Sequence, residues 1–214
     1  FRFLYYLMAW LELALVGNHA GWFVPINIVL NIFVAAQVYW FGTKLSGSRG
    51  SGFLAGILYL LSRMSYYQIS QVYGLMETAA TAMALGILIL LYFQVNGKGK
   101  DKGFYSACAL YFAICFVHER YLALLPLLYL ALLLSHKKGQ KFNWKKWAAP
   151  AVSFGAVMGI RRLAIGSVLP AGTGGTQVAD TFSIKEAVWY ALCQVGYVFG
   201  CNAGPEHLNG MSWQ

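Results

Sequence analysis

The sequence predicts an all-α fold, a polytopic transmembrane helical bundle of about six spans with one interfacial helix. Three observations predict it. Hydrophobic residues make up 59% of the 214 residues and charged residues only 11%, whereas soluble domains are about 45–50% apolar and about 25% charged. The apolar residues come in long runs separated by short loops, and the lysines are concentrated in every second loop. This composition excludes a disordered chain, a basic nucleic-acid-binding protein and a small disulfide-stapled protein.

The first two apolar runs differ in length. Residues 3–16 are apolar apart from Glu12 and are too short to span a bilayer comfortably. We expect an interfacial helix there, with a shortened or re-entrant helix as the alternative. Residues 21–42 would form a helix of roughly 33 Å, which is long enough to cross the hydrocarbon core. This second run is therefore the first expected span.

Five further apolar runs complete the expected six spans: 53–70, 73–94, 104–117, 121–135 and 147–166. After the last run come a Gly-rich segment, 170–176, and a mixed segment, 182–200. We therefore expect a bundle over 1–166, which includes the interfacial helix, and an outer Gly-rich loop with part of a further helix over 167–214. The chain opens on Phe1 without a signal sequence, so we interpret it as an internal fragment of a longer polytopic protein.

Positive charge is concentrated in three connecting segments, 43–52, 96–103 and 136–146, which hold nine lysines and Arg49 against Asp101 alone. Short loops rich in Lys and Arg stay on the cytoplasmic side of a membrane. We therefore predict an integral, multi-pass membrane protein with these three loops in the cytoplasm. The three loops account for the whole net charge of +9, so the charges of the outer surface are balanced.

The positive charges expected on the outer surface are mainly arginines. The planar guanidinium group suits bidentate contacts with phosphate or carboxylate groups. An enzyme that handles a lipid phosphate needs such donors beside its apolar spans. The candidate phosphate-binding residues are Arg2, Arg63, Arg120, Arg161 and Arg162. The alternative is that these arginines snorkel at helix ends and pair with nearby glutamates.

A His-Glu-Arg triplet at 118–120 supplies most of the candidate catalytic groups. Charged groups at membrane depth are costly unless they are partnered, so the triplet favours a functional site, with a solvated turn as the alternative. His118 is a candidate proton relay, and Glu119 is a candidate proton acceptor or ligand of a sugar hydroxyl. Glu77 opens an otherwise apolar run, either as a charge favoured by the helix N-terminus or as a third catalytic candidate.

The remaining polar residues give no metal signal. The triplet lacks the second His of a His-Glu-x-x-His zinc motif, and the four cysteines do not have metal-ligand spacing. Spacing alone leaves open whether Cys193 and Cys201 form a disulfide. The glycines of 170–176 favour a flexible outer loop over a phosphate cradle. Asn27 and Asn31, four residues apart, are expected to hydrogen-bond to neighbouring helices.

Several motifs between Arg2 and about Leu134 follow one another in an order known from one enzyme group. These motifs are Phe1-Arg2-Phe3-Leu4-Tyr5-Tyr6-Leu7, Gly17-Asn18, Ile26-Asn27-Ile28-Val29-Leu30-Asn31, Gly74-Leu75-Met76-Glu77-Thr78 and Val117-His118-Glu119-Arg120-Tyr121. With them the chain resembles the integral-membrane glycosyltransferases of the GT-C type, and it looks most like their protein O-mannosyltransferase-like branch.

The resemblance implies an inverting transferase that moves a sugar from a polyprenyl-phosphate donor to an acceptor on the non-cytoplasmic face. A carboxylate would deprotonate the acceptor hydroxyl while arginines stabilise the leaving phosphate. In this group the main carboxylate lies on a loop that would precede Phe1. The implied partners are the lipid-linked sugar and membrane lipids, without nucleic acid. No cofactor is certain, and a need for a divalent metal stays open. A secondary transporter or channel is the alternative function.

Overall fold

The computed structural model describes residues 2–71, 74–97, 101–136 and 143–166, with a few isolated positions beyond them. Over these residues all regular structure is helical, which confirms the all-α prediction. The elements in chain order are α1 (Phe3–Val16), η1 (Ala20–Trp22), α2 (Phe23–Ser46), α3 (Arg49–Leu61), α4 (Arg63–Ser70), α5 (Gly74–Val95), α6 (Asp101–Ile114), η2 (Glu119–Leu124), α7 (Leu125–Ser135) and α8 (Trp144–Ile165).

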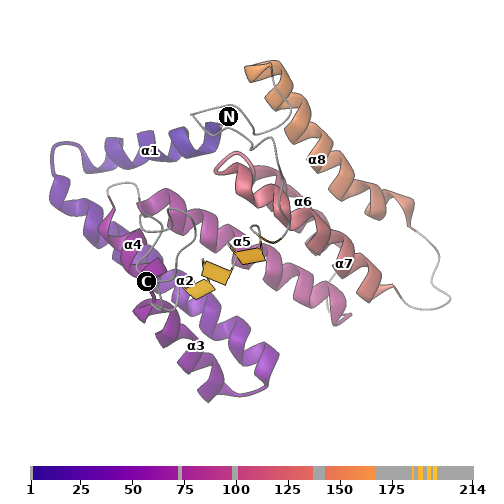
Figure 1. Ribbon diagram of the computed structural model, residues 1–214, viewed down its shortest axis with the longest axis horizontal. Coiled ribbons are helices and arrows are strands. Elements are labelled where there is room, and N and C mark those ends of the chain that lie inside the picture. Colours follow the sequence, from indigo (N-terminus) through magenta and orange to yellow (C-terminus); the bar gives the residue numbers. More distant parts are fainter. Residues whose placement is uncertain are drawn as a thin grey trace.

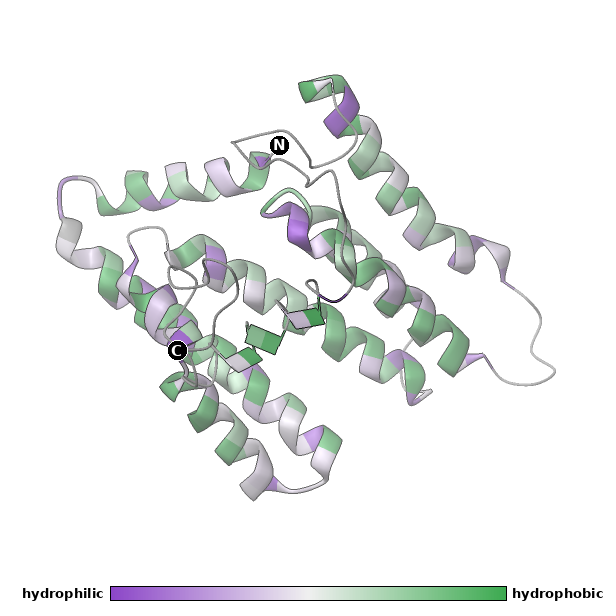
Figure 2. Cartoon of the chain, in the orientation of Figure 1, coloured by the Kyte–Doolittle hydropathy of each residue, from purple (hydrophilic) through white to green (hydrophobic). Residues whose placement is uncertain are grey.

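Three of these helices, α2, α5 and α8, are long and apolar enough to cross a membrane. They correspond to the runs 21–42, 73–94 and 147–166. Helices α1 and α3 are apolar but shorter. Figure 2 shows hydrophobic residues along most of the length of the helices and polar residues mainly near their ends. By length and composition, the chain therefore has helices that can span a membrane.

The other expected spans are shorter elements than hydropathy predicts. The run 53–70 is divided at Ser62, whose extended backbone ends α3 and whose Oγ accepts the Ser65 N–H to begin α4. The run 121–135 starts as the 3-10 helix η2 and continues as α7, with Pro126 in the first turn of α7. Proline is tolerated there because first-turn N–H groups lack intrahelical acceptors. The Ser62 cap and Pro126, which hydropathy does not weigh, therefore mark these boundaries.

The longer helices run along a common direction, and α1 crosses one end of the bundle (Figure 1). Helix α5 is central, because it packs against α2 as well as against α6 and α7, while α8 packs against α6 and α7. The hydrophobic core lies between α5, α6, α7 and α8. Phe104, Tyr111 and Leu128 are fully buried in it, and Val157 is 1% exposed.

Helices α2 and α3 approach each other closely because two glycines of α3 lie against the backbone of α2. Gly52 and Gly56, four residues apart on α3, lie against Tyr39, Ala35 and Thr43 of α2. A Cβ atom at Gly52 would lie only 2.6 Å from the Tyr39 carbonyl oxygen, so no larger residue fits without a shift of the helices. Pairs of small residues with this spacing are common where membrane helices pack.

Polar contacts join the chain connections at two opposite ends of the bundle. At one end, the Tyr92 hydroxyl donates to the Lys44 carbonyl oxygen over 3.1 Å, and Lys146 Nζ lies 2.6 Å from an Asp101 carboxylate oxygen. The first contact joins the segment 43–52 to the last turn of α5, and the second joins the described parts of 96–103 and 136–146. We call this the basic end. The turn after α1, η2 and the last turn of α8 lie toward the other end (Figure 1), which we call the cluster end.

Candidate functional site

Five charged or titratable side chains meet at the cluster end, and we call them the charged cluster: Arg2, Glu77, His118, Glu119 and Arg120. Arg2 precedes α1, Glu77 lies in the first turn of α5, and the other three residues surround the start of η2. The ion pairs within the cluster join residues that are 117 and 43 positions apart in the chain. All five were candidate site residues in the sequence, and the fold brings them together.

The guanidinium of Arg2 holds the Glu119 carboxylate with two hydrogen bonds. Arg2 Nε donates to Oε2 over 2.9 Å and Nη2 donates to Oε1 over 3.2 Å. The hydrogen bond from Arg2 lowers the pKa of Glu119 to about 2, so this carboxylate is ionised at neutral pH. A backbone hydrogen bond from the Tyr5 N–H to the Phe116 carbonyl oxygen, 3.4 Å long, fixes α1 beside the same loop.

Arg120 forms the second ion pair of the cluster, with Glu77. Its guanidinium also lies 5.1 Å from the centre of the Tyr121 ring, a cation–π contact. Glu77 occupies the first turn of α5, where the helix dipole favours a negative charge. Glu77 is therefore a helix-terminal charge that also pairs with Arg120, and its catalytic role stays a prediction.

His118 ends the loop after α6 and caps η2. Its Nδ1 accepts the backbone N–H of Arg120 over 3.2 Å. Burial lowers the pKa of His118, and the neighbouring charges of Arg120 and Arg2 lower it further. The imidazole is therefore neutral at pH 7. Because Nδ1 accepts a hydrogen bond, we assign the proton to Nε2, which leaves one donor for a ligand.

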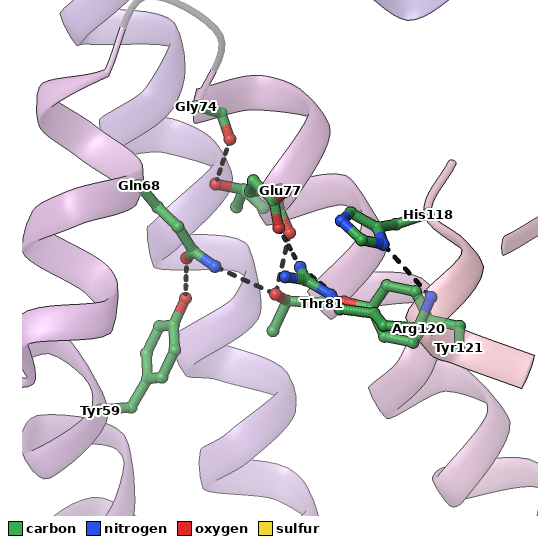
Figure 3. A network of polar contacts seen from close by, with 9 residues as sticks. Tyr59, Gln68, Gly74, Glu77, Thr81, His118, Arg120 and Tyr121 are labelled. Atoms are coloured by element: carbon green, nitrogen blue, oxygen red, sulfur yellow. Dashed lines mark hydrogen bonds and ion pairs between the residues drawn. The ribbon is translucent and has the colours of Figure 1, made fainter. Parts of the chain in front are cut away.

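A chain of uncharged hydrogen bonds continues from the charged cluster into the bundle (Figure 3). The Thr81 hydroxyl donates a hydrogen bond to the Glu77 carbonyl oxygen over 2.8 Å, and it accepts a hydrogen bond from Gln68 Nε2 over 3.0 Å. The Tyr59 hydroxyl lies 2.9 Å from Gln68 Oε1 and 2.8 Å from Asn31 Oδ1. Sequence reasoning missed Tyr59, Gln68 and Thr81, although polar residues inside apolar runs were a signal for them.

The prediction for Asn27 and Asn31 is confirmed. Asn27 Nδ2 donates to the Gln71 carbonyl oxygen over 2.9 Å, and Asn31 Nδ2 lies 3.3 Å from the Thr78 hydroxyl. Gly74 permits the close approach of these segments, because a Cβ atom there would lie 2.7 Å from Asn27 Nδ2 and would overlap the Gln68 carbonyl. These contacts hold the first turns of α5, and with them Glu77, against α2 and α4.

The other three candidate arginines have different surroundings. Arg63 is exposed at the first residue of α4. Arg162 Nη1 donates to the Gly166 carbonyl oxygen over 2.6 Å, which closes the end of α8. Arg161 is 1% exposed, and its Nε, Nη1 and Nη2 have no hydrogen-bond partner among the residues that the structure describes. Of the five candidate arginines, Arg2 and Arg120 form the two ion pairs described for the charged cluster.

An apolar cavity of about 340 Å³ opens beside the charged cluster. It lies between the first turn of α1, the end of α6 and the end of α8, and is lined by Phe3, Leu4, Phe112, Ala113, Phe116 and Ile160. Phe3 follows Arg2 in the chain, and Phe116 precedes His118 by two residues. The cluster end therefore presents ionic and apolar surfaces next to each other.

The described part of the chain holds no group of three or more His, Cys, Asp or Glu side chains that could bind a metal ion. Cys193 is buried. Cys201 and the Gly-rich segment 170–176 lie outside the described residues, so the interpretations of the disulfide and the loop stay predictions.

No family model, curated protein or solved structure matches this chain. Function is therefore inferred from the charged cluster and from the cavity beside it. Together they offer guanidinium donors, carboxylate acceptors, an imidazole N–H and an apolar recess at one end of a bundle of membrane-type helices.

Proposed function

We propose that this chain belongs to a membrane glycosyltransferase that moves a sugar from a polyprenyl-phosphate donor to an acceptor on the non-cytoplasmic face. The observation that carries the proposal is the charged cluster beside the apolar cavity. A lipid-linked sugar combines a phosphate, a hydrocarbon chain and hydroxyl groups, and each has complementary chemistry at the cluster end. The resemblance of the sequence motifs to GT-C type enzymes supports the same proposal.

The proposed topology places the basic end in the cytoplasm, because short Lys-rich loops stay there. Helices α2, α5 and α8 cross the membrane singly. We propose that the runs 53–70 (α3 and α4), 104–117 (α6) and 121–135 (α7 and the part of η2 after Arg120) make the remaining three spans. Helix α1 then lies in the outer interface, where its exposed Trp10 and Tyr6 would contact lipid headgroups.

In the proposed mechanism, the arginines of the charged cluster stabilise the charge that grows on the leaving phosphate. A guanidinium has five N–H donors, and Arg2 uses two of its own on Glu119. The Nε2–H of His118 is a further donor for a phosphate or sugar oxygen. The two ion pairs fix the arginine side chains before the donor binds, which limits the cost of ordering them.

The two glutamates of the cluster would then have different roles. A carboxylate with a pKa of about 2 is a weak base at neutral pH, so Glu119 serves to position Arg2. Glu77 positions Arg120 and is the remaining candidate in the described residues to accept the proton of the acceptor hydroxyl. A carboxylate on a loop before Phe1, as the resemblance implies, would take over that step if Glu77 only positions Arg120.

The proposal is tested by sugar transfer from a polyprenyl-phosphate sugar in liposomes that contain the purified protein. Replacing Arg120 with Ala, or Glu77 with Gln, should lower turnover about 10²-fold, because each removes a charge that fixes or stabilises the transition state. Lys102→Ala at the exposed basic end is the matched control and should keep full turnover. If both cluster variants keep the wild-type rate while the protein is active, the site is elsewhere.

One observation favours the transporter alternative. The break between α3 and α4 at Ser62 lies next to a buried polar network, and secondary transporters bind substrates beside interrupted helices. In the same liposomes, a transporter would move a water-soluble solute across the bilayer without any sugar transfer. Solute flux that is lost in Gln68→Leu, with no transferase activity in wild type, would replace the enzyme proposal.

A further inference from the structure

A small polar pocket lies at the basic end, away from the charged cluster. It is formed by the last turn of α5, the end of α7 and the first turn of α8. Its lining is mainly polar and includes Gln94, Ser135, His136, Asn143 and Lys146. Its volume is about 40 Å³. The pocket therefore has room for about three water molecules, at roughly 10–15 Å³ each, or for one group of similar size such as a phosphate.

Gln94 supplies the pocket with an acceptor whose orientation is fixed. The residue is 8% exposed, and its Nε2 donates to Ser135 Oγ over 3.3 Å. The Ser135 hydroxyl donates its only proton to the Leu132 carbonyl oxygen over 3.1 Å, so the amide has to present Nε2 to Ser135. Among the residues that the structure describes, Gln94 Oε1 has no hydrogen-bond partner. A buried acceptor of this kind is unfavourable unless a ligand or a water molecule donates to it.

The first turn of α8 supplies donors to the same pocket. The ammonium of Lys146 has three N–H donors, and its pairing with the exposed Asp101 leaves others for a ligand. Asn143 caps α8, because its Oδ1 accepts the backbone N–H of Lys146 over 3.3 Å, so Nδ2 is the side-chain atom that can donate. The positive end of the α8 dipole lies here as well. This side of the pocket therefore favours an anion.

The opposite side of the pocket favours a ligand that also has a proton to donate. Gln94 Oε1 is an acceptor, and the C-terminal ends of α5 and α7, where helix dipoles are negative, meet at the pocket. A phosphate monoester combines both requirements, because its second pKa is about 6 and its monoanion carries one P–OH besides its acceptor oxygens. A phosphodiester and a sulfate ion have the negative charge but lack this proton.

We infer that the pocket at the ends of α5, α7 and α8 is a binding site for a phosphate monoester. The P–OH donates to Gln94 Oε1, and the other phosphate oxygens accept from Lys146 and Asn143. A phosphatidic acid headgroup and free phosphate share this chemistry, and basic pockets between membrane helices are known to bind lipid headgroups. The site uses no residue of the charged cluster, so the inference does not depend on sugar transfer.

Calorimetric titration of the purified protein in detergent at pH 6 tests the inference with two pairs of probes. Dioctanoylphosphatidic acid is compared with dioctanoylphosphatidylmethanol, a phosphodiester without a hydroxyl group, and inorganic phosphate is compared with sulfate. In at least one pair, the probe that carries a P–OH should bind at least about tenfold more tightly, the effect of one hydrogen bond to a charged ligand. Selectivity in the lipid pair alone identifies a lipid headgroup, and selectivity between the ions identifies phosphate itself.

Three variants separate the pocket from the general positive charge of the basic end. Gln94→Leu should bring the two members of a pair to within about twofold of each other, because it removes the acceptor, and Lys146→Met should weaken the preferred probe at least about tenfold. Lys145→Met is the matched control, since Lys145 is exposed and does not line the pocket, and it should leave binding unchanged. A wild type without selectivity, as expected if water alone fills the pocket, would overturn the inference. Selectivity that survives Gln94→Leu, or equal weakening by Lys145→Met and Lys146→Met, would overturn it as well.

Discussion

Both ends of the bundle carry charged residues, but the two ends differ in how these residues are paired and exposed. At the cluster end, Arg2 and Arg120 are held by carboxylates from distant parts of the chain. At the basic end, the described residues form one ion pair, between Lys146 and the exposed Asp101, and Lys102 and Lys145 are exposed. Solvated lysines in short loops set orientation and contact anionic lipids. Paired arginines fix a geometry, and the chemistry is therefore expected at the cluster end.

The ends also differ in buried charge. Glu12 on α1 is 1% exposed and neither of its carboxylate oxygens has a partner, and Arg161 is in the same condition. Both lie on elements that reach the cluster end. Charges of this kind lower stability. In the part of the chain that the structure describes they occur at the cluster end, which indicates that a requirement other than stability selects them there.

The largest expected effect concerns the sides of the membrane that the two ends face. In a variant without the native cysteines, we expect Cys at Lys102 and Cys at Asn18 to react from opposite sides of sealed cells or vesicles. Both positions are exposed, one beside the basic end and one in the turn after α1. A membrane-impermeant maleimide, added before and after permeabilisation, measures this. If both positions are labelled from the same side, the two ends of the bundle do not face opposite sides of a membrane, and the proposed topology is wrong.

The sequence was sufficient to predict the long helices, but it was not sufficient to predict where capping side chains interrupt an apolar run. Continuous apolar runs predicted the residue ranges of α2, α5 and α8 closely, because the length and hydropathy of a run are local properties of the sequence. The break at Ser62 depends on one side-chain hydrogen bond to the Ser65 N–H, which hydropathy does not register. The described residues therefore contain three helices that are long and apolar enough to cross a membrane, whereas the sequence predicted six spans.

The sequence predicted which residues belong to the charged cluster, but it did not predict which of them form ion pairs with each other. Each charged residue is conspicuous in an apolar chain, so all five members were candidates. The pairing of Arg2 with Glu119 depends on how α1 lies against the loop after α6, which is a tertiary property. The lack of a partner for Arg161 is likewise visible only once the neighbours of α8 are known.

The two ends of α5 should differ in their tolerance of a methyl group. Gly74→Ala at the cluster end would push into the Gln68 carbonyl and Asn27, at a cost of about 3 kcal/mol. Gly97→Ala, just beyond the basic end of α5, meets open space but has a φ of +68°, so it should cost only about 1 kcal/mol. Unfolding in mixed micelles measures both. Equal losses would show that the α5 N-terminus is not closely packed.

Neutralising Glu12 should raise stability. Burial raises the pKa of Glu12 from about 4.5 to about 6, so the folded protein binds this proton more tightly than the unfolded chain does. Stability from this group is therefore greatest below pH 4.5, falls as the pH rises through 6, and is constant above it. Glu12→Gln should gain about 2 kcal/mol at pH 8 and little at pH 4. A variant that is less stable at pH 8 would mean that Glu12 has a cationic partner.

The Arg2–Glu119 pair should show the opposite pH dependence with a smaller amplitude. Because its folded pKa is about 2, the Glu119 carboxylate contributes stability that is complete above about pH 4.5 and is lost as the pH falls toward 2. The contribution is about 1 kcal/mol, since the Arg2 side chain is 37% exposed and solvent screens the pair. Thermal unfolding in detergent between pH 7 and pH 3 measures it, in a Glu12→Gln background that removes the opposing titration. Glu119→Gln should flatten the profile in that range, whereas Lys102→Ala should not. If Glu119→Gln left the acid loss unchanged, the carboxylate would not be held by Arg2, and the cluster end would differ from the basic end only in its composition.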